Sequence, residues 1–212
     1  MKNRTGVAAL IVCGVLGSSF AAEPEKKEDD RSKGTYGDPA NDESKQGVSD
    51  PMMADMQPGP QHKLLEGLAG TWACVTRHWM DPAQPGARIE HEVRSSMILG
   101  GRFLRIETTG DFFGVPFESL TIMGYDRRHE RYTIVGFDTL GTYFVTAEGS
   151  RDEESKSLRL KGTTHDPKTG ATERYTFVYR DITPESYVSE VWFTTPDERE
   201  VKVVESTCTR TR

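Results

Sequence analysis

Hydrophobic and polar positions alternate along residues 70–210 in short runs, and turn residues separate one run from the next. Between residues 88 and 94 the even positions are charged, whereas the odd positions carry Ile89, His91 and Val93. This period of two is typical of a strand that buries one face. The pattern predicts ten strands, at about 70–79, 88–99, 102–109, 115–125, 130–138, 142–149, 157–164, 172–181, 186–195 and 199–210. Ten consecutive strands without a helix between them predict an all-β fold, an antiparallel up-and-down barrel whose closure removes exposed edges.

Two further patterns add detail to the predicted barrel. A two-residue turn at residues 100–101 pairs residue 99 with residue 102, which places Arg94 opposite Glu107 as a cross-strand ion pair on the outer face. Three leucines at helical spacing precede the first strand, so residues 61–69 are predicted to form a short N-terminal helix.

The first 22 residues have the order of a secretory signal peptide. Lys2 and Arg4 precede an apolar run at residues 6–16, and small residues follow at 19–22 as a cleavage site. Because the apolar run is too short to span a bilayer, the pattern predicts an exported protein, periplasmic or secreted, with no membrane span in the mature chain. The alternative is an uncleaved N-terminal anchor.

Composition divides the rest of the chain into two parts. Residues 23–60 contain ten acidic and five basic residues and a single aromatic side chain, which predicts a disordered acidic tether. Residues 61–212 contain 23 acidic and 20 basic residues and form the predicted barrel domain. A domain with so small a net charge lacks the basic surface that binds nucleic acid, so no nucleic-acid partner is expected.

Polar residues on the inner face are the candidates for function, because a buried polar group needs a partner. If Trp72 points inward, His78 shares its face. A hairpin across residues 80–87 would place His78 opposite Ile89, which makes His78 and His91 diagonal neighbours, about 7–8 Å apart at Cα. One interpretation of such a pair is a metal, haem or proton-transfer site. The alternative is two hydrogen-bonded histidines near the rim. No third ligand follows from the spacing, so no metal site is predicted.

Three carboxylates are predicted to reach the same inner face. Glu190 and Glu205 follow from the pairing of the last two strands, together with Trp192, and Glu118 follows from the alternation around it. Buried carboxylates with raised pKa values act as acids or bases, although neighbouring Arg, Tyr or Thr groups can instead satisfy them. The sequence contains no Gly-x-Ser-x-Gly, P-loop, Cys-x-x-Cys, His-Glu-x-x-His or dinucleotide-binding motif, so it predicts no particular reaction.

Cys74 and Cys208 lie on the first and last predicted strands, which are neighbours in a closed barrel. Cys13 lies in the predicted signal peptide, so an exported mature chain has two cysteines and one possible disulfide. Cys74 has the inward phase of its strand, whereas Cys208 has the opposite phase from an inward Val203. A β-bulge near Val203 and Val204 would restore the phase. The alternatives are a Cys74–Cys208 disulfide and two separate buried thiols.

Six short motifs lie between residues 61 and 210. They are Leu68-Ala-Gly-Thr-Trp72, Leu99-Gly-Gly-Arg-Phe-Leu104, Pro116-Phe-Glu118, Gly124-Tyr-Asp126, Asp138-x-x-Gly141-Thr142 and Asp166-Pro-x-Thr-Gly170. Together they resemble a bacterial family of exported or cytosolic proteins that is classed as a domain of unknown function. The resemblance implies a barrel and carries no assigned activity.

The Gly70-x-Trp72 step, with Arg210 near the end of the last strand, also resembles the lipocalin and wider calycin pattern. In that group a terminal arginine packs over the tryptophan, which implies that Trp72 and Arg210 form a structural pair. Nitrobindin-like haem barrels are another similar group. Their haem ligand is a histidine on a late strand, and the last three predicted strands here contain none.

These features favour a binding protein, an exported barrel that holds a small, partly apolar ligand in its lumen. The candidate ligand-binding residues are His78, His91, Glu118, Glu190, Trp192 and Glu205. One alternative is an enzyme that uses inward His or Glu side chains for proton transfer, and another is a structural or interaction domain with a filled lumen. The sequence identifies no cofactor, and the oligomeric state does not follow from it.

Overall fold

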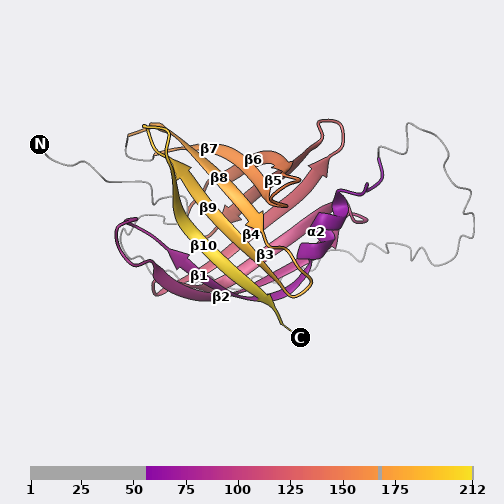
Figure 1. Cartoon of the computed structure of the whole chain (residues 1–212). Helices are drawn as coiled ribbons and strands as arrows, with labels where there is room; N and C mark the ends of the chain where they lie inside the picture. Colours follow the sequence, from indigo (N-terminus) through magenta and orange to yellow (C-terminus); the bar gives the residue numbers. More distant parts are fainter. Residues whose placement is uncertain (1–55, 167–168, 212) are drawn as a thin grey trace, which may run out of the picture.

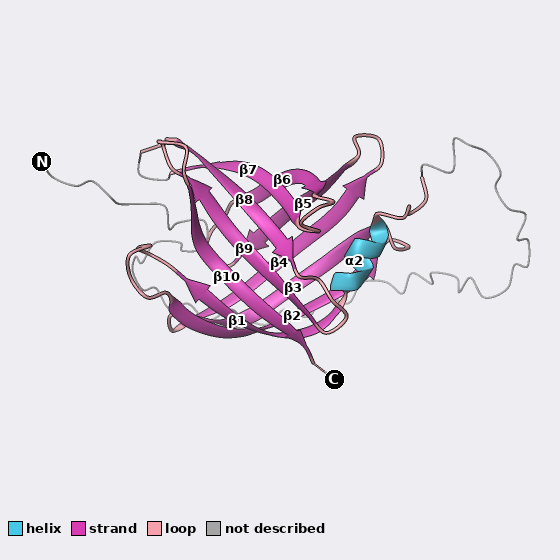
Figure 2. Ribbon diagram, viewed as in Figure 1, coloured by secondary structure: helices cyan, strands magenta, loops and turns pink. Residues whose placement is uncertain are grey.

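The computed structural model describes residues 56–166 and 169–211 of the chain (Figure 1). It contains helix α2 (His62–Leu68) and the strands β1 (Gly70–His78), β2 (Ala87–Ile98), β3 (Phe103–Phe112), β4 (Val115–Asp126), β5 (Arg131–Asp138), β6 (Phe144–Arg151), β7 (Leu158–His165), β8 (Thr172–Arg180), β9 (Ser186–Thr194) and β10 (Glu200–Arg210). Each strand pairs antiparallel with its sequence neighbours, and β10 pairs with β1 to close the barrel (Figure 2). The predicted ten-stranded up-and-down barrel with a short helix before it is therefore confirmed.

Two of the predicted segments fall largely outside the described residues. The predicted signal peptide at residues 1–22 lies there entirely, and so does most of the predicted tether at residues 23–60. In the part of the chain that the structure describes, no helix combines the length and the apolar character needed to cross a bilayer.

The last residues of the predicted tether contact the barrel. Arg102 Nε donates a hydrogen bond to the Met56 carbonyl oxygen at 3.1 Å, and its Nη2 donates to the side-chain oxygen of Gln57 at 3.1 Å. The described domain therefore includes residues before the boundary at residue 61 that the sequence predicted.

The two ends of the barrel differ. We call one end the mouth; it carries the β1–β2, β3–β4, β5–β6, β7–β8 and β9–β10 turns. We call the other end the base; it carries the remaining turns, the last strand residues and α2. In Figure 1 the base lies toward the right, where α2 and the C-terminal end are seen, and the β1–β2 and β9–β10 turns of the mouth lie at the left.

The base holds the packed core. Helix α2 buries His62 and three leucines, which join a hydrophobic cluster around Trp72. Trp72 is fully buried, and its Nε1 donates a hydrogen bond to the Leu68 carbonyl oxygen at 3.0 Å. The guanidinium carbon of Arg210 lies 4.0 Å from the centre of the Trp72 ring, and Nη1 of Arg210 donates to the Ala69 carbonyl oxygen at 2.8 Å. The arginine thus covers the ring and satisfies backbone at the junction between α2 and β1.

Gly70 is required by this contact. Its φ is 141°, and a Cβ on residue 70 would lie 2.0 Å from Nη1 of Arg210. Any side chain there would displace the guanidinium from the Trp72 ring. The Gly-x-Trp step therefore keeps space for the arginine that reaches it from the other end of the chain.

The predicted ion pair between β2 and β3 is wrong, although the register is right. Arg94 lies opposite Glu107 as predicted. However, Arg94 Nε binds the carboxylate of Glu92 at 2.6 Å, and Arg105 binds that of Glu107 at 2.5 Å, each on its own strand. Exposed pairs of this kind contribute about 0–1 kcal/mol in either arrangement, so the register does not depend on them.

A disulfide joins β1 to β10. Cys74 lies directly opposite Cys208 in the ladder, the two Cα atoms are 4.1 Å apart, and a disulfide links the two sulfur atoms. The register between β9 and β10 shifts between Lys202 and Val204, where the sequence placed a bulge. The bulge brings Cys208 onto the inner face, so the structure has the disulfide and not two separate thiols.

Candidate functional site in the barrel lumen

The inner faces of β1–β4 and β8–β10 enclose a cavity of about 240 Å³ that extends inward from the mouth. Phe112, Phe117 and Val191 contribute apolar wall, and hydroxyl groups come from residues such as Ser189. His78 and His91 both line this cavity, as their inward phase predicted. Apolar walls with a few polar groups are typical of sites that bind small molecules.

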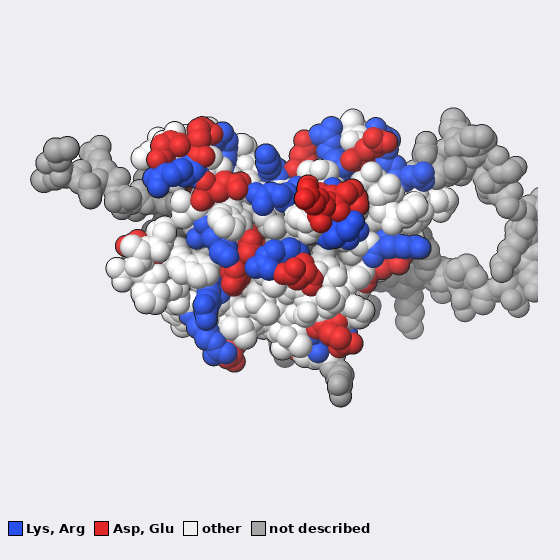
Figure 3. Space-filling view, in the orientation of Figure 1, with Lys and Arg blue, Asp and Glu red and all other residues white. Residues whose placement is uncertain are grey.

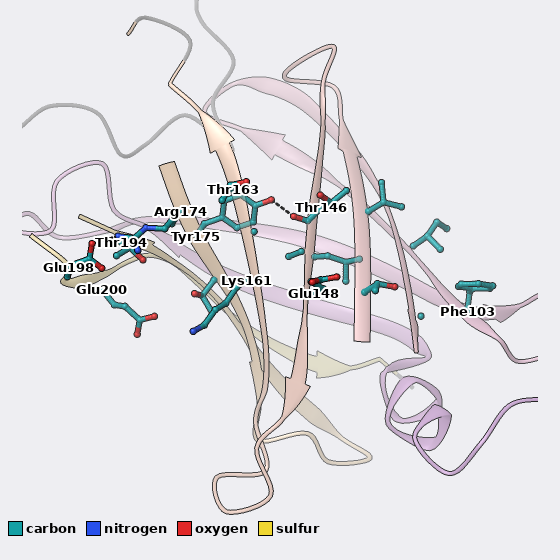
Figure 4. Close-up of a pocket in the computed structure, with 18 residues that line it drawn as sticks. Phe103, Thr146, Glu148, Lys161, Thr163, Arg174, Tyr175, Thr194, Glu198 and Glu200 are labelled. Carbon is teal, nitrogen blue, oxygen red and sulfur yellow. Dashed lines mark hydrogen bonds and ion pairs between the residues drawn. The ribbon is translucent and has the colours of Figure 1, made fainter. Parts of the chain in front are cut away.

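A larger concavity, of about 840 Å³, lies over the outer faces of β4–β9 and extends to Phe103 on β3 and Glu200 on β10 (Figure 4). Its charged side chains are largely paired: Arg174 binds Glu198 at 2.6 Å, and Glu148 binds Arg131 at 2.5 Å. The dashed line in Figure 4 marks a hydrogen bond of 2.7 Å that the Tyr175 hydroxyl on β8 donates to the backbone oxygen of Thr146 on β6, two strands away. Because this surface is open and most of its charges are paired, the lumen is the stronger candidate site.

His78 stands at the mouth end of β1 and is 2% exposed. The rings of Phe112 and Phe113 lie nearly perpendicular to the imidazole, with ring centres 5.6 Å and 6.2 Å away. Burial lowers the pKa of His78 below its ordinary value, so the imidazole is neutral at pH 7. Among the side chains that the structure describes, Nδ1 of His78 is the one buried nitrogen or oxygen without a hydrogen-bond partner.

His91 lies deeper, opposite Cys74 on β1. Its Nδ1 is 3.5 Å from the hydroxyl oxygen of Thr76, and that hydroxyl makes a short hydrogen bond with the hydroxyl of Ser206. Burial lowers the pKa of His91 as well, so a second neutral imidazole faces the lumen. The three side chains form a chain of hydrogen bonds across β10, β1 and β2.

The prediction that His78 and His91 are diagonal neighbours is wrong. His78 pairs with Ala87, not with Ile89. The reason is that the β1–β2 loop runs from Trp79 to Gly86, one residue earlier in the chain than the predicted loop at residues 80–87. His78 and His91 are therefore four residues apart along the ladder, about 13 Å. In the described ranges, no group of three or more His, Cys, Asp or Glu side chains is placed to hold a metal.

The predicted inward carboxylates point outward. Glu118 is exposed, because the inner face of β4 carries the odd-numbered neighbours that line the lumen. Glu190 and Trp192 lie on the outer face of β9, since the residues before each of them, Ser189 and Val191, line the lumen. Glu205 lies opposite Glu190 and also faces outward. None of these four residues lines the lumen cavity.

Three of them instead form a charged cluster on the outer face of β8–β10, together with Arg180 and Lys202. Arg180 Nη2 donates to Glu190 at 2.9 Å, Lys202 Nζ donates to it at 3.2 Å, and Trp192 Nε1 donates to it at 2.8 Å. Lys202 also binds Glu205 and lies over the Trp192 ring, 5.3 Å from its centre. Figure 3 shows the alternating positive and negative side chains over this face. The cluster is fully partnered, which indicates a structural role.

Glu190→Gln is expected to lower the free energy of unfolding by about 1–3 kcal/mol, because Glu190 is 5% exposed and its partners would keep their charges without it. Burial alone would raise the pKa of Glu190, but hydrogen bonds from Trp192, Arg180 and Lys202 outweigh it and lower the pKa.

A depressed folded-state pKa means that this stabilisation is present above the unfolded value, near 4.5, and is lost as the pH falls through the folded value. Urea unfolding between pH 3 and 7 should therefore show a flatter pH profile for Glu190→Gln than for wild type. The control Glu118→Gln, on an exposed side chain, should match wild type within about 0.5 kcal/mol. Equal losses for the two variants would contradict the role given to the cluster.

Phe113 occupies an unusual turn position at the mouth. Phe112 pairs with Val115, so Phe113 and Gly114 form a two-residue turn, with φ of 54° and 87°. Both positions of such a turn favour Gly, Asn or Asp, and a bulky side chain there is strained. The Phe113 ring is 56% exposed, and its centre lies 4.6 Å from that of Phe112. The strained turn therefore holds an exposed aromatic ring against Phe112, which lines the lumen cavity.

Phe113→Asn is expected to raise the free energy of unfolding by about 1 kcal/mol, because asparagine adopts this backbone conformation with less strain. The control Phe113→Ala removes the ring but keeps the strained position, so it should give no such gain. Urea denaturation measures both. A Phe113→Ala variant as stabilised as Phe113→Asn would show that loss of the exposed ring, and not turn geometry, is responsible.

Sequence reasoning missed several lumen residues. Ser206 has the same inward phase as Cys208 once the bulge is placed, and it lies opposite Thr76 in the β1–β10 pairing. The alternation of the strand, combined with the bulge, could therefore have predicted the hydrogen bond between Ser206 and Thr76. Tyr179 and Tyr187 also line the cavity. Burial raises the pKa of Tyr179 to about 12 and that of Tyr187 further, so both hydroxyls are neutral donors at pH 7. The lumen therefore offers neutral polar groups in an apolar wall.

The fold and the site define the class of protein: a closed, ten-stranded antiparallel β-barrel with a partly polar lumen. A family described as "Protein of unknown function (DUF1579)" matches residues 57–210, and the chain belongs to this family. The resemblance to a bacterial family of unknown function that the motifs indicated is confirmed. No match is found among curated proteins.

Among solved structures, the chain is similar to Rv2717c from M. tuberculosis, with a TM-score of 0.51 and 15% sequence identity over 74% of this chain and 100% of that one. A redesigned β-barrel gives a TM-score of 0.35 and 12% identity, over 70% of this chain and 95% of that one. At 15% identity the similarity to Rv2717c shows only that the two chains share a barrel fold, and nothing is inferred from the similarity to the redesigned barrel.

Proposed function

We propose that this barrel binds a small, partly apolar molecule in its lumen. The observation that carries the proposal is His78, a neutral imidazole in the wall of a cavity with a buried nitrogen that has no hydrogen-bond partner. Protein interiors are normally close-packed, and their buried polar groups are normally paired. A cavity beside a buried imidazole with one unpaired nitrogen supports a site in which a bound molecule meets the other ring nitrogen.

The size and chemistry of the cavity support a small ligand. A volume of about 240 Å³ corresponds to about eight water molecules at their liquid volume. A cavity of this volume can hold a molecule about the size of a single substituted aromatic ring. Aromatic side chains near the mouth and hydroxyl groups deeper in the lumen match a ligand with an apolar body and a polar end.

Native mass spectrometry of the protein purified from its own host tests the proposal. The expected result is an additional small-molecule mass on the wild-type barrel. Ser189→Leu puts a larger side chain on the lumen wall, and that variant should lose the added mass. The control Thr207→Leu, on the exposed outer face, should keep it. A wild-type protein without added mass, or a mass that Ser189→Leu retains, would argue against lumen binding.

A second candidate function is proton-transfer catalysis in the same lumen. The hydrogen-bonded series His91, Thr76 and Ser206 favours it, because a hydroxyl beside an imidazole is the arrangement that activates a nucleophile. Turnover of a small ester that Thr76→Val abolishes and Ser189→Ala retains would favour this function over binding alone.

Export is a further part of the proposal. The Cys74–Cys208 disulfide supports it, because disulfides persist in oxidising compartments, and so does the signal-peptide pattern of residues 1–22. The intact mass of the protein from fractionated cells tests it. A mature chain beginning near residue 23, with residues 23–60 retained as a tether, is expected outside the cytoplasm. A cytoplasmic chain that retains residues 1–22 would contradict export.

A further inference from the structure

We infer that the lumen ligand is an uncharged molecule with a hydrogen-bond acceptor, such as a carbonyl oxygen, and that His78 binds this acceptor through Nε2–H. The inference rests on the proposed binding of a small molecule in the lumen and adds the chemical class of that molecule. It follows from the position of the proton on one ring and from the charges around the cavity.

The unpaired Nδ1 of His78 indicates which of the two ring nitrogens carries the hydrogen. A neutral imidazole carries one N–H group and one bare nitrogen. Nδ1 is buried without a partner, and an orphaned buried N–H is rarer than an orphaned acceptor. Nδ1 is therefore the bare nitrogen, and Nε2 carries the hydrogen. Because Nδ1 is enclosed by protein, Nε2 is the ring atom that a molecule in the lumen can meet, and it meets that molecule as a donor.

The surroundings of His78 strengthen such a hydrogen bond. Phe112 and Phe113 pack nearly perpendicular to the imidazole, and Phe112 lines the cavity beside it. A hydrogen bond in an apolar, water-poor environment is electrostatically stronger than in water. A ligand with an apolar body and one acceptor atom would pack against the phenyl rings while the acceptor receives a hydrogen bond from Nε2–H.

The charges around the lumen favour a neutral ligand. Among the described residues that line the cavity there is no lysine or arginine, and the one carboxylate is Asp111, which is exposed at the mouth. A buried anion would have no cation to pair with and would pass a negative group on entry. A cation would find no carboxylate inside the lumen. Burying an unpaired charge costs far more than burying a carbonyl group that receives a hydrogen bond.

Three probes of similar size test the inference on the full chain: acetophenone, with a carbonyl acceptor; ethylbenzene, which lacks it; and benzoate, an anion. Titration followed by ¹H–¹⁵N spectra of the histidine rings gives both the affinity and the tautomer. Acetophenone is expected to bind about tenfold more tightly than ethylbenzene and to shift the Nε2 signal of His78. His78→Phe should remove this preference, and the control His165→Phe, on an exposed residue, should keep it.

The outcomes separate this inference from the proposed function. Equal binding of acetophenone and ethylbenzene would overturn the inference and leave lumen binding intact. Tightest binding of benzoate would overturn the neutral class. Absence of binding by all three probes, with no co-purified mass, would overturn the proposed function itself. If His78→Phe does not fold, the ring spectra of the wild type still decide, since a protonated Nδ1 on His78 contradicts the inference.

Discussion

Trp72→Ala is expected to lower the free energy of unfolding by about 3–5 kcal/mol, because it opens a cavity in the base that the neighbours cannot fill. The indole is fully buried and meets the ring of Tyr187 edge to face, with centres 4.8 Å apart. Its removal also leaves the Leu68 carbonyl oxygen without the indole N–H and leaves Arg210 without the ring beneath it. Urea denaturation of the purified barrel measures the loss.

Trp79→Ala is the matched control, since it removes the same side chain from the mouth, where the residue is only half-buried. Its loss is expected to be about 1–2 kcal/mol. Arg210→Ala, combined with Trp72→Ala in a double-mutant cycle, should show a coupling energy of about 0.5–2 kcal/mol for the cation over the ring. A Trp72→Ala loss no larger than that of Trp79→Ala would remove the organising role given to Trp72.

The sequence correctly predicts which side chains of a strand face the lumen when the predicted hairpin register is right. It does so as well when that register is wrong by two residues. The β1–β2 loop shifts the pairing of His78 by two positions, and such a shift leaves every side chain on its own face. His78 and His91 are therefore inward, as predicted, although they are not neighbours. The length of a loop such as residues 79–86 depends on its own hydrogen bonds, which the alternation of the strands does not contain.

A register error of one residue has the opposite effect, and it accounts for Glu190 and Trp192. In the β9–β10 turn the N–H of Thr195 donates to the Arg199 carbonyl oxygen at 2.8 Å, and Glu198 takes a φ of 64°. This turn pairs Trp192 with Lys202, one position from the predicted pairing. Because side chains alternate with a period of two, both predicted lumen residues of β9 move to the outer face.

The bulge on β10 affects two predictions at once. It brings Cys208 onto the inner face and turns Glu205 onto the outer face, so an inward Glu205 and an inward Cys208 were incompatible. The outer cluster with Arg180 and Lys202 was not predicted, since charged side chains on an outer face normally remain in water. Its members come together only when the pairing of β8, β9 and β10 is known.

Loss of the Cys74–Cys208 disulfide is expected to lower the free energy of unfolding by about 4–5 kcal/mol. The two cysteines are 134 residues apart, and the chain-entropy treatment gives a cross-link over so long a loop about this value. The bridge also fixes the seam between β1 and β10, the only pairing in the barrel between strands distant in sequence. Both cysteines are buried, at 2% and 1% exposure, so the folded barrel protects the bond from reductants.

Urea denaturation of the wild type with and without a reductant, beside the double variant Cys74→Ala/Cys208→Ala, measures this effect. The reductant should destabilise the wild type and leave the variant unchanged. Thiol titration of the denatured, unreduced protein gives an independent count. It should find no free thiol in a chain that has lost residues 1–22, and one, from Cys13, in a chain that retains them. Two free thiols in the processed chain would show that the seam is held by strand pairing and packing alone.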